Sequence, residues 1–426
     1  MTTIHIFDTS VLITNPSAYN DFDNSDVIIP ITVLDELDKL KKLPNEAGKN
    51  ARVAVRRLDE LSNTAPDLSL GTTLDNNVHL SIDTTTYPAS SDALYGDVRI
   101  LACAKAIAKE RKKDDIIVVS NDLNMRVRAR AMGMRAQSYN KNVSPNDLYA
   151  GVQYVENKEA VMALAKGSVK PSDYDLKLNA NECVVFQENG VDVVKARKTA
   201  KDSIRAIKKA TPWDLEARNT EQEFAIDLLL DPRIPLITFI GNAGTGKSLI
   251  SLACGLEMVL NKKIYERMII YRPTVSVDEG VGWLPGELDT KLAPWMQPIH
   301  DNLEVLMSKG ESKAKATLDM YQKKGKIEID ALSFIRGRSI PNSFVLFDEA
   351  QNCSVSQIKT VLTRIGENSK IVLTGDISQI DNKDLDPINN GLSYVIEKFK
   401  GSPLSGHLTL TQGQRSPLAT AAAELL

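Results

Sequence analysis

Short apolar runs alternate with helical patterns along residues 1–140. The strand-length apolar runs are residues 4–7, 27–31 and 116–120, and the stretches with helical spacing are residues 33–43, 100–109 and 121–132. Strands that alternate with helices predict a parallel sheet covered by helices. Residues 62–91 are rich in Thr, Ser, Asp and Asn, and they predict a loop with one short strand at 78–82.

The pattern changes over residues 141–212. Residues 182–187 and 191–196 are strand-like and flank Glu188-Asn189-Gly190, and an Asn-Gly between two such runs predicts a β-hairpin. Residues 195–209 carry seven basic side chains and one acidic side chain, and we expect them to form a helix that leads into the next part of the chain. This region therefore predicts a small β-rich connector with a basic segment.

Strands and helices alternate again from residue 213. The apolar runs of strand length are residues 236–240, 268–271, 344–347 and 371–373, with a helical pattern at 248–260. The 426 residues are enough for two or three domains. We therefore predict an α/β protein with a first domain at 1–140, a connector at 141–212 and a second α/β domain at 213–426.

Composition narrows the class of protein. The hydrophobic fraction of 42% and the charged fraction of 25% are typical of soluble globular chains. The net charge of −3 excludes a uniformly basic nucleic-acid coat, but it allows local basic surfaces. The four cysteines are widely separated, which argues against a zinc finger and favours reduced thiols. With no charged leader and no apolar run long enough for a bilayer, we expect a cytoplasmic protein without a membrane segment.

A phosphate-binding loop stands between a predicted strand and a predicted helix. Its residues are Gly241, Asn242, Ala243, Gly244, Thr245, Gly246, Lys247 and Ser248, which match G-x-x-x-x-G-K-[ST]. Glycines let the backbone N–H groups surround a phosphate, and the positive end of the following helix faces the same anion. Lys247 is expected to reach the β- and γ-phosphates and Ser248 to bind Mg²⁺.

Further residues fit a nucleotide site. Asp348 and Glu349 follow an apolar strand, so Asp348 is placed to hold Mg²⁺ and Glu349 to polarise an attacking water. Asp376 ends another apolar strand, where a polar tip can sense the γ-phosphate. The amide of Gln222 suits the edge of adenine, although a surface glutamine is the simpler interpretation. Arg415 is a candidate arginine finger or an ordinary surface residue.

The motifs of the second half resemble the PhoH family. The resemblance is carried by residues 219–222, the loop at 241–248, and residues 271–274, 282–287, 347–352, 373–376 and 415–417, and the stretch 283–304 is an especially specific match. It covers about residues 215–420. It implies the RecA-like nucleotide-binding fold of superfamily 1 helicases and ATP hydrolysis coupled to RNA.

One RecA-like core is half of what superfamily 1 helicases generally carry in a chain. We therefore expect several chains to share the work in a homo-oligomeric ring, a hexamer being one such form. Arg415 or Arg272 is then a candidate to complete the active site of a neighbouring chain.

Four acids of the first domain are placed to converge. Asp8 and Asp122 follow predicted strands, and parallel strands end at a shared edge; helix starts can bring Glu36 and Asp97 to the same edge. Converging carboxylates repel one another unless cations such as Mg²⁺ or Mn²⁺ intervene. A site of this kind can support an in-line phosphodiester displacement. The alternative is that each acid is an ordinary helix cap.

The segments around these acids resemble PIN domains, which are metal-dependent ribonucleases. The segments are residues 7–13, 33–41, 96–104 and 118–126, in the order that the family has. The resemblance implies Asp8, Glu36, Asp97 and Asp122 as metal ligands, with Asp92 as a competitor of Asp97, and gives Asp8 and Asp122 catalytic roles.

Together, the resemblances to the PhoH family and to PIN domains predict an ATPase motor that moves or unwinds single-stranded or structured RNA, and a nuclease that cuts this RNA. The basic segment 195–209 and the arginines at 126, 128, 130 and 135 are candidate RNA contacts or simply solvated helix faces. The alternative is a regulatory RNA-binding ATPase with an inactive PIN domain. A P-loop kinase for a small molecule is a third class, which Glu349 argues against.

Overall fold

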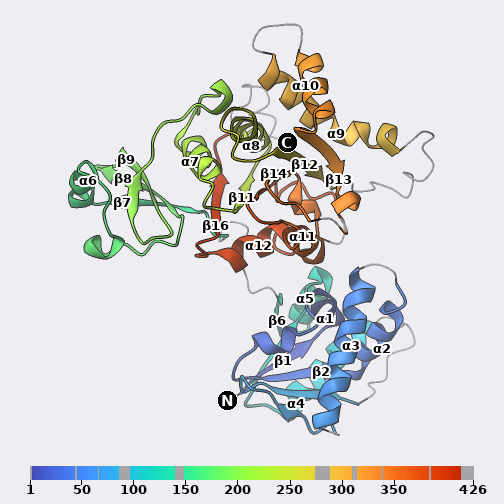
Figure 1. Ribbon diagram of the computed structural model, residues 1–426. Helices are drawn as coiled ribbons and strands as arrows, with labels where there is room; N and C mark the ends of the chain where they lie inside the picture. Colours follow the sequence, from blue (N-terminus) through green and yellow to red (C-terminus); the bar gives the residue numbers. More distant parts are fainter. Residues whose placement is uncertain are drawn as a thin grey trace. The chain divides into compact units, whose positions relative to one another are not determined.

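The computed structural model describes residues 2–43, 46–65, 67–85, 96–139, 148–273, 288–308, 314–335, 337, 339–382 and 385–413. The chain divides into two compact units, unit 1 (Met1–Val143) and unit 2 (Ser144–Leu426) (Figure 1). Unit 1 holds one sheet, and unit 2 holds a large and a small sheet.

Unit 1 is an α/β domain built on a six-stranded sheet. Across the sheet, its strands are β3 (Thr72–Thr73), β4 (His79–Asp83), β2 (Asp26–Pro30), β1 (Thr3–Phe7), β5 (Asp115–Val119) and β6 (Arg135–Gln137). All neighbours are parallel except β3 and β4. The predicted parallel sheet is confirmed, because the central strands are apolar on both faces and buried under helices.

Among the residues of unit 1 that the structure describes, five α-helices accompany this sheet. They are α1 (Thr9–Thr14), α2 (Ile31–Leu40), α3 (Glu46–Thr64), α4 (Gly96–Glu110) and α5 (Leu123–Ala131). The sequence patterns above miss α3, although it is the longest helix described in this unit. Its buried face includes Ala51, Ala54 and Leu58, and two of these three are alanines, which give a weak hydrophobic signal.

Unit 2 is built on a fully parallel sheet of six strands. Across the sheet these are β13 (Ile327–Ala331), β12 (Arg267–Arg272), β14 (Ser343–Phe347), β15 (Lys370–Gly375), β11 (Leu236–Gly241) and β16 (Ser405–Leu410). The accompanying helices are α7 (Thr220–Leu230), α8 (Lys247–Leu256), α9 (Leu288–Met307), α10 (Ala314–Lys323), α11 (Val355–Leu362) and α12 (Gly391–Phe399). Because all strands point the same way, β11, β14 and β15 end at one edge, where the nucleotide motifs lie.

The connector forms a separate sheet within unit 2. In order across the sheet, its strands are β10 (Ile204–Ala206), β9 (Val191–Lys198), β8 (Cys183–Glu188) and β7 (Val152–Glu156), with α6 (Lys158–Leu164) on one face. β8 and β9 are the predicted hairpin, with Asn189 and Gly190 at positive φ in its turn. Cys183 and Val185 on the opposite face join the core of the large sheet.

The basic segment 195–209 is not the helix that the sequence suggested. It comprises the end of β9 and the whole of β10, which pair antiparallel. Alternation places Lys195 and Arg197 on the sheet face toward α7, where they pair with Glu223 and Asp227. The helix prediction is wrong because positive charges at these positions compensate the acids of α7 and do not form a solvated helix face.

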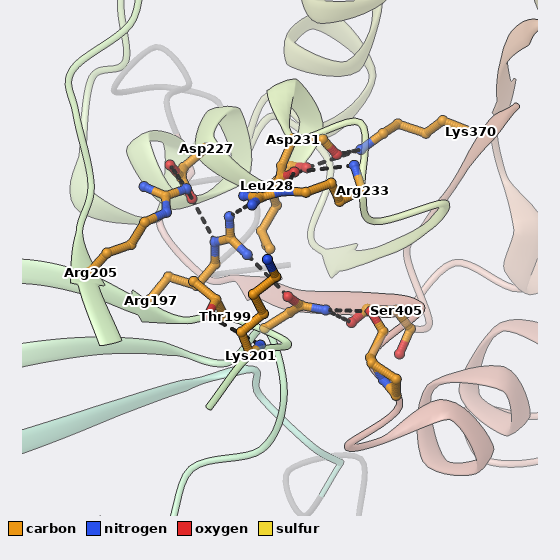
Figure 2. Close-up of polar contacts among 12 residues, drawn as sticks. Arg197, Thr199, Lys201, Arg205, Asp227, Leu228, Asp231, Arg233, Lys370 and Ser405 are labelled. Carbon is orange, nitrogen blue, oxygen red and sulfur yellow. Dashed lines mark hydrogen bonds and ion pairs between the residues drawn. The ribbon is translucent and has the colours of Figure 1, made fainter. Parts of the chain in front are cut away.

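A buried network attaches the connector to α7 (Figure 2). Arg197 is 1% exposed; its Nε donates to Asp227 Oδ2 at 2.6 Å and its Nη2 to Asp231 Oδ2 at 2.7 Å. Burial alone would raise the pKa of Asp231, but hydrogen bonds from Arg233 and Arg197 outweigh it and hold the pKa well below its ordinary value. Lys370 of β15 donates to the main-chain oxygen of Asp231 at 2.8 Å. The C-terminal end of α7 is thus tied to both sheets of unit 2.

Among the helices that the structure describes, none combines the length and the apolar character needed to cross a membrane.

Candidate nucleotide and metal sites

The phosphate-binding loop joins the end of β11 to the start of α8. Gly244 and Gly246 have φ values of 86° and 93°, a region where L side chains are strained and glycine is not. Gly246 is the N-cap of α8, so Lys247 is the first helical residue. The N-terminal N–H groups of α8 therefore face the space above the loop, an arrangement suited to an anionic phosphate.

The two predicted metal-binding residues of this site lie in direct contact. Ser248 Oγ donates to Asp348 Oδ1 at 2.7 Å, and Thr374 Oγ1 donates to the same oxygen at 2.6 Å. Lys247 Nζ donates to the main-chain oxygens of Gly241 and Asn242. A hydroxyl and a carboxylate side by side are hard oxygen donors, which fits Mg²⁺. Thr374 was not predicted as a site residue.

Glu349 lies beside this pair in a constrained conformation. Its φ is 57°, unusual for a residue with a side chain, and it directly follows the end of β14 and Asp348. Burial raises the pKa of Glu349, and the charge of Asp348 raises it further. Arg272 Nη2 contacts Glu349 Oε1 at 3.3 Å within the same chain. A carboxylate with a raised pKa is a better proton acceptor, as a general base requires.

Gln351 connects Glu349 to the phosphate-binding loop, a role that the sequence analysis missed. The fully buried Gln351 donates through Nε2 to Glu349 Oε2 at 2.6 Å, and its Oε1 accepts from the N–H of Asp376 at 3.1 Å. The carboxylate of Asp376 in turn accepts from the N–H of Ala243 at 2.8 Å. A Cβ on Gly375 would come within 2.5 Å of Gln351 Oε1, so a glycine is needed there.

Gln222 holds the phosphate-binding loop in this structure. Its Nε2 donates to the main-chain oxygen of Thr245 at 3.0 Å, and its Oε1 accepts from the N–H of Arg218 at 2.9 Å. Both ends of the amide therefore bind main chain, and the recognition of adenine stays a prediction. Arg415 lies outside the described residues, and so do residues 283–287 of the stretch 283–304. Their predicted roles stay predictions.

In unit 1, Asp8 and Asp122 follow β1 and β5, as predicted. Asp8 Oδ2 accepts from the hydroxyls of Ser10 at 2.5 Å and Ser120 at 2.6 Å, and Asp8 Oδ1 accepts from the N–H of Thr9 at 2.7 Å. Asp122 caps α5 by accepting from the N–H of Asn124 at 2.7 Å. Asp8 and Asp122 are therefore helix caps as well as metal-ligand candidates.

The other two acids lie within electrostatic range of these. Burial raises the pKa of Glu36, and the charges of Asp8 and Asp97 raise it further. Burial likewise raises the pKa of Asp97, with further contributions from Asp8 and Asp122. Thr9 Oγ1 donates to Glu36. The four candidate metal ligands are all carboxylates, the ligand type that Mg²⁺ and Mn²⁺ prefer. Across the described part of the chain, however, no three acidic, His or Cys side chains are arranged to hold a metal ion.

The arginines that follow Asp122 have partners within the protein. Arg126 donates to the main-chain oxygen of Ser120 at 2.8 Å, and Arg130 donates to that of Ala136 at 3.2 Å. Ion pairs join Arg128 to Asp97 and Arg135 to Asp115. Each of these side chains helps to fix the local structure, and RNA binding by them stays a prediction.

Comparisons with known proteins match both halves of the chain. The family model for "PhoH-like protein" matches residues 214–425, and the model for "PIN domain" matches residues 5–140. Among solved structures, the Pif1 helicase from Candida albicans is similar over 46% of this chain and 40% of that chain, at 15% identity and a TM-score of 0.25.

Two of the curated relatives match almost the whole chain, and a third matches about half of it. The protein PhoH2 of Bacillus subtilis is 38% identical over 100% of both chains. The protein PhoH2 of Mycolicibacterium smegmatis is 33% identical, covering 99% of this chain and 96% of the relative. The protein PhoH of Escherichia coli is 32% identical over 52% of this chain and 58% of the relative. The chain therefore belongs to the family in which an N-terminal PIN domain is followed by a PhoH-type P-loop ATPase domain.

Proposed function

We propose that this protein is an ATP-dependent RNA-processing enzyme, in which the PhoH-type ATPase drives RNA movement or unwinding and the PIN domain is a divalent-metal endoribonuclease. The observation that carries the proposal is the connected set Ser248, Asp348 and Glu349 beside the phosphate-binding loop. It supplies an Mg²⁺ position and a proton acceptor at one edge of the sheet.

The residues of the nucleotide site divide the work of hydrolysis. Lys247 and the loop N–H groups bind the phosphates, and Ser248 and Asp348 would hold Mg²⁺, which neutralises charge that develops on the phosphates. Glu349 takes a proton from the attacking water, favoured by its raised pKa. Gln351 orients Glu349 toward the loop.

In the PIN domain the residues that would hold Mg²⁺ or Mn²⁺ are Asp8, Glu36, Asp97 and Asp122. The metal, when bound, would activate water and stabilise the pentavalent phosphate of a phosphodiester cleavage. The hydroxyls of Ser10 and Ser120 fix the carboxylate of Asp8, so that its orientation is set before substrate binds.

We extend the proposal to the assembly and the setting. Single-stranded or structured RNA is the partner. A homo-oligomeric ring, of which a hexamer is one form, shares the motor function between chains. Cytoplasmic location is supported by the four cysteines, which are widely separated in the sequence and all buried, as expected where thiols stay reduced.

The test is metal-dependent cleavage of a labelled RNA, together with ATP hydrolysis, in the wild type and two variants. Asp8→Asn should abolish cleavage and leave ATP hydrolysis within about twofold, whereas Lys247→Ala should lower ATP hydrolysis by about 100-fold or more and spare cleavage of unstructured RNA. Asp67→Asn, an exposed acid of the same unit, is the matched control for Asp8. An Asp8→Asn protein that cuts RNA like the wild type would exclude the nuclease assignment.

The second candidate is a regulatory RNA-binding ATPase with an inactive PIN domain. It is favoured by the finding that the described acids form no group of three able to hold a metal ion. Under this alternative, Mg²⁺ or Mn²⁺ added without ATP leaves single-stranded RNA intact while RNA still binds. Under the main proposal, the same experiment gives metal-dependent cleavage.

A further inference from the structure

Arg272 lies beside the proposed base Glu349 at the edge of the large sheet. It is the last residue of β12, and Glu349 follows the neighbouring strand β14 by two residues. The two strands are in register, with Tyr271 paired with Phe347, and the N–H of Asp348 donates to the Tyr271 oxygen at 2.9 Å. The strand pairing therefore brings Arg272 to Glu349 of the same chain.

The guanidinium of Arg272 uses both of its terminal nitrogens. Nη2 donates to Glu349 Oε1 at 3.3 Å, and Nη1 donates to the main-chain oxygen of Trp295 in α9 at 3.1 Å. This oxygen is a fixed anchor, because Ile299 and Leu303 of α9 are fully buried in the core of the large sheet. Since a guanidinium is planar and rigid, the anchor sets the direction from which Nη2 meets the carboxylate.

Glu349 is held from the other side as well. Gln351 Nε2 donates to Glu349 Oε2 at 2.6 Å, so each carboxylate oxygen has a donor of its own. A carboxylate that accepts on both oxygens cannot turn without losing a bond, and this fixes the lone pairs that face an attacking water. The side chain of Arg272 is only 18% exposed, so water screens its pairing with Glu349 weakly.

We infer that Arg272 is a positioning residue for ATP hydrolysis within its own chain, which holds Glu349 through a fork anchored on α9. This role differs from that of an arginine finger on a neighbouring chain, for which the sequence made Arg272 a candidate. The inference rests on the proposed ATP hydrolysis. It predicts that loss of Arg272 lowers turnover and leaves nucleotide affinity nearly unchanged, because Glu349 acts on the water and not on the bound phosphates.

The first test compares Arg272→Ala with Arg267→Ala at the other end of the same strand. Arg267 is also partly buried and also paired with a glutamate, Glu328, at 2.8 Å, so its variant is the matched control. Arg272→Ala should lower kcat about 10-fold or more and leave KM, and the affinity for a fluorescent ATP analogue, within about threefold. Arg267→Ala should keep the wild-type kcat. An equal loss of kcat in both variants, or a loss of affinity as large as that of kcat, would overturn the inference.

Arg272→Lys separates charge from geometry. Lysine keeps the positive charge, but its single nitrogen does not reproduce the planar fork that joins Glu349 to Trp295. We expect kcat to stay at least about threefold below that of the wild type. A folded Arg272→Lys protein with wild-type kcat would contradict the anchored fork even if Arg272→Ala does not fold.

A double-mutant cycle with Glu349→Gln asks whether Arg272 acts through Glu349. If it does, adding Arg272→Ala to Glu349→Gln lowers the single-turnover rate of hydrolysis less than about twofold further. Losses that multiply would show that Arg272 acts elsewhere on the reaction, and the inference would then be wrong.

Mixed chains distinguish action within a chain from action across chains. Chains with Arg272→Ala and chains with Glu349→Gln are co-expressed, purified together and assayed for ATP hydrolysis. Action on a neighbour would restore hydrolysis, because some sites then combine an intact Glu349 with an intact Arg272 from the next chain. We expect no more hydrolysis than the two variants give separately, and restoration would overturn the inference. A wild-type protein that does not hydrolyse ATP would instead contradict the proposed function.

Discussion

At the scale of single residues, the nucleotide site is organised by groups that never need to touch the nucleotide. Gln351 bonds to the proposed base Glu349 and, through Asp376, to the N–H of Ala243 in the phosphate-binding loop. Thr374 shares one oxygen of Asp348 with Ser248. Such bonds fix charged side chains before substrate binds, which lowers the cost of reaching the transition state.

Gln351→Ala tests this arrangement. Because the hydrogen bond to Glu349 is charge-assisted, its loss should cost about 1.5–3 kcal/mol and lower kcat for ATP roughly 10- to 100-fold. Affinity for an ATP analogue should change little, since Gln351 binds the base and not the loop directly. Steady-state kinetics measure both, with Gln297→Ala on the exposed face of α9 as control. Equal kcat in the variant and the wild type would show that Gln351 does not position Glu349.

His407 predicts a pH dependence of stability. It is buried in β16 between Thr238 and Thr409, and burial lowers its pKa to about 3 from an ordinary 6.5. The unfolded chain then binds one more proton than the folded chain between these values, so stability is full above pH 6.5 and falls as pH drops through this window. The loss is about 1.4 kcal/mol per pH unit.

The measurement is denaturant unfolding followed by tryptophan fluorescence, since all three tryptophans lie in unit 2. His407→Gln should lower stability near neutral pH and flatten the acid dependence by about one proton. Parallel pH curves for the two proteins would be incompatible with a neutral buried histidine.

At the scale of elements, α7 connects three parts of unit 2. Its first turn contacts the phosphate-binding loop and the segment after β16, its middle pairs with the connector through Asp227, and its end binds Lys370 of β15. The helix is apolar toward the large sheet and acidic toward the connector. One helix therefore aligns the small sheet with the nucleotide site.

Arg197→Met tests the joint between α7 and the connector. It leaves Asp227 and Asp231 buried near fewer cations, and breaking a buried pair costs about 3–5 kcal/mol in the free energy of unfolding. Arg233→Ala also removes a partner of Asp231, but this arginine is 68% exposed, so the cost should be under about 1 kcal/mol. Tryptophan-monitored unfolding in urea measures both, and equal costs would contradict the distinction.

The sequence predicted those elements and site residues whose signal is local. The loop at 241–248 could be recognised by its fixed residue spacing. Asp348 and Asp8 could be recognised because each directly follows an apolar strand. Arg197 could not be assigned, because its partners are 30 and 34 residues away and only the fold brings them together. The bonds of Gln351 to Asp376 and of Glu221 to Thr411 were unpredictable for the same reason.

At the scale of the whole molecule, the compact unit that contains the ATPase is longer than the segment with the PhoH-like motifs. Unit 2 begins at Ser144, and its main core includes Cys183 and Val185 from β8. The PhoH-like match begins only at residue 214. The connector is therefore part of the fold of the ATPase and not a spacer between two independent domains.

Two fragments test this conclusion. Residues 144–426 should unfold in one tryptophan-monitored transition and hydrolyse ATP. Residues 213–426 lack Arg197 and the apolar side chains of β8, so we expect a much lower transition midpoint or aggregation. Equal midpoints for the two fragments would show that the connector is dispensable.

The buried pairing of Arg197 with Asp227 and Asp231 also bears on how such a chain can be inherited. A recombination event that carried only the PhoH-like segment into another gene would deliver Asp227 without its arginines and Asp231 with the exposed Arg233 as its only arginine. Selection would favour crossovers upstream of β7, which keep both sides of the joint in one exchange. An exchange that moved the connector together with the ATPase would keep both sides of this joint.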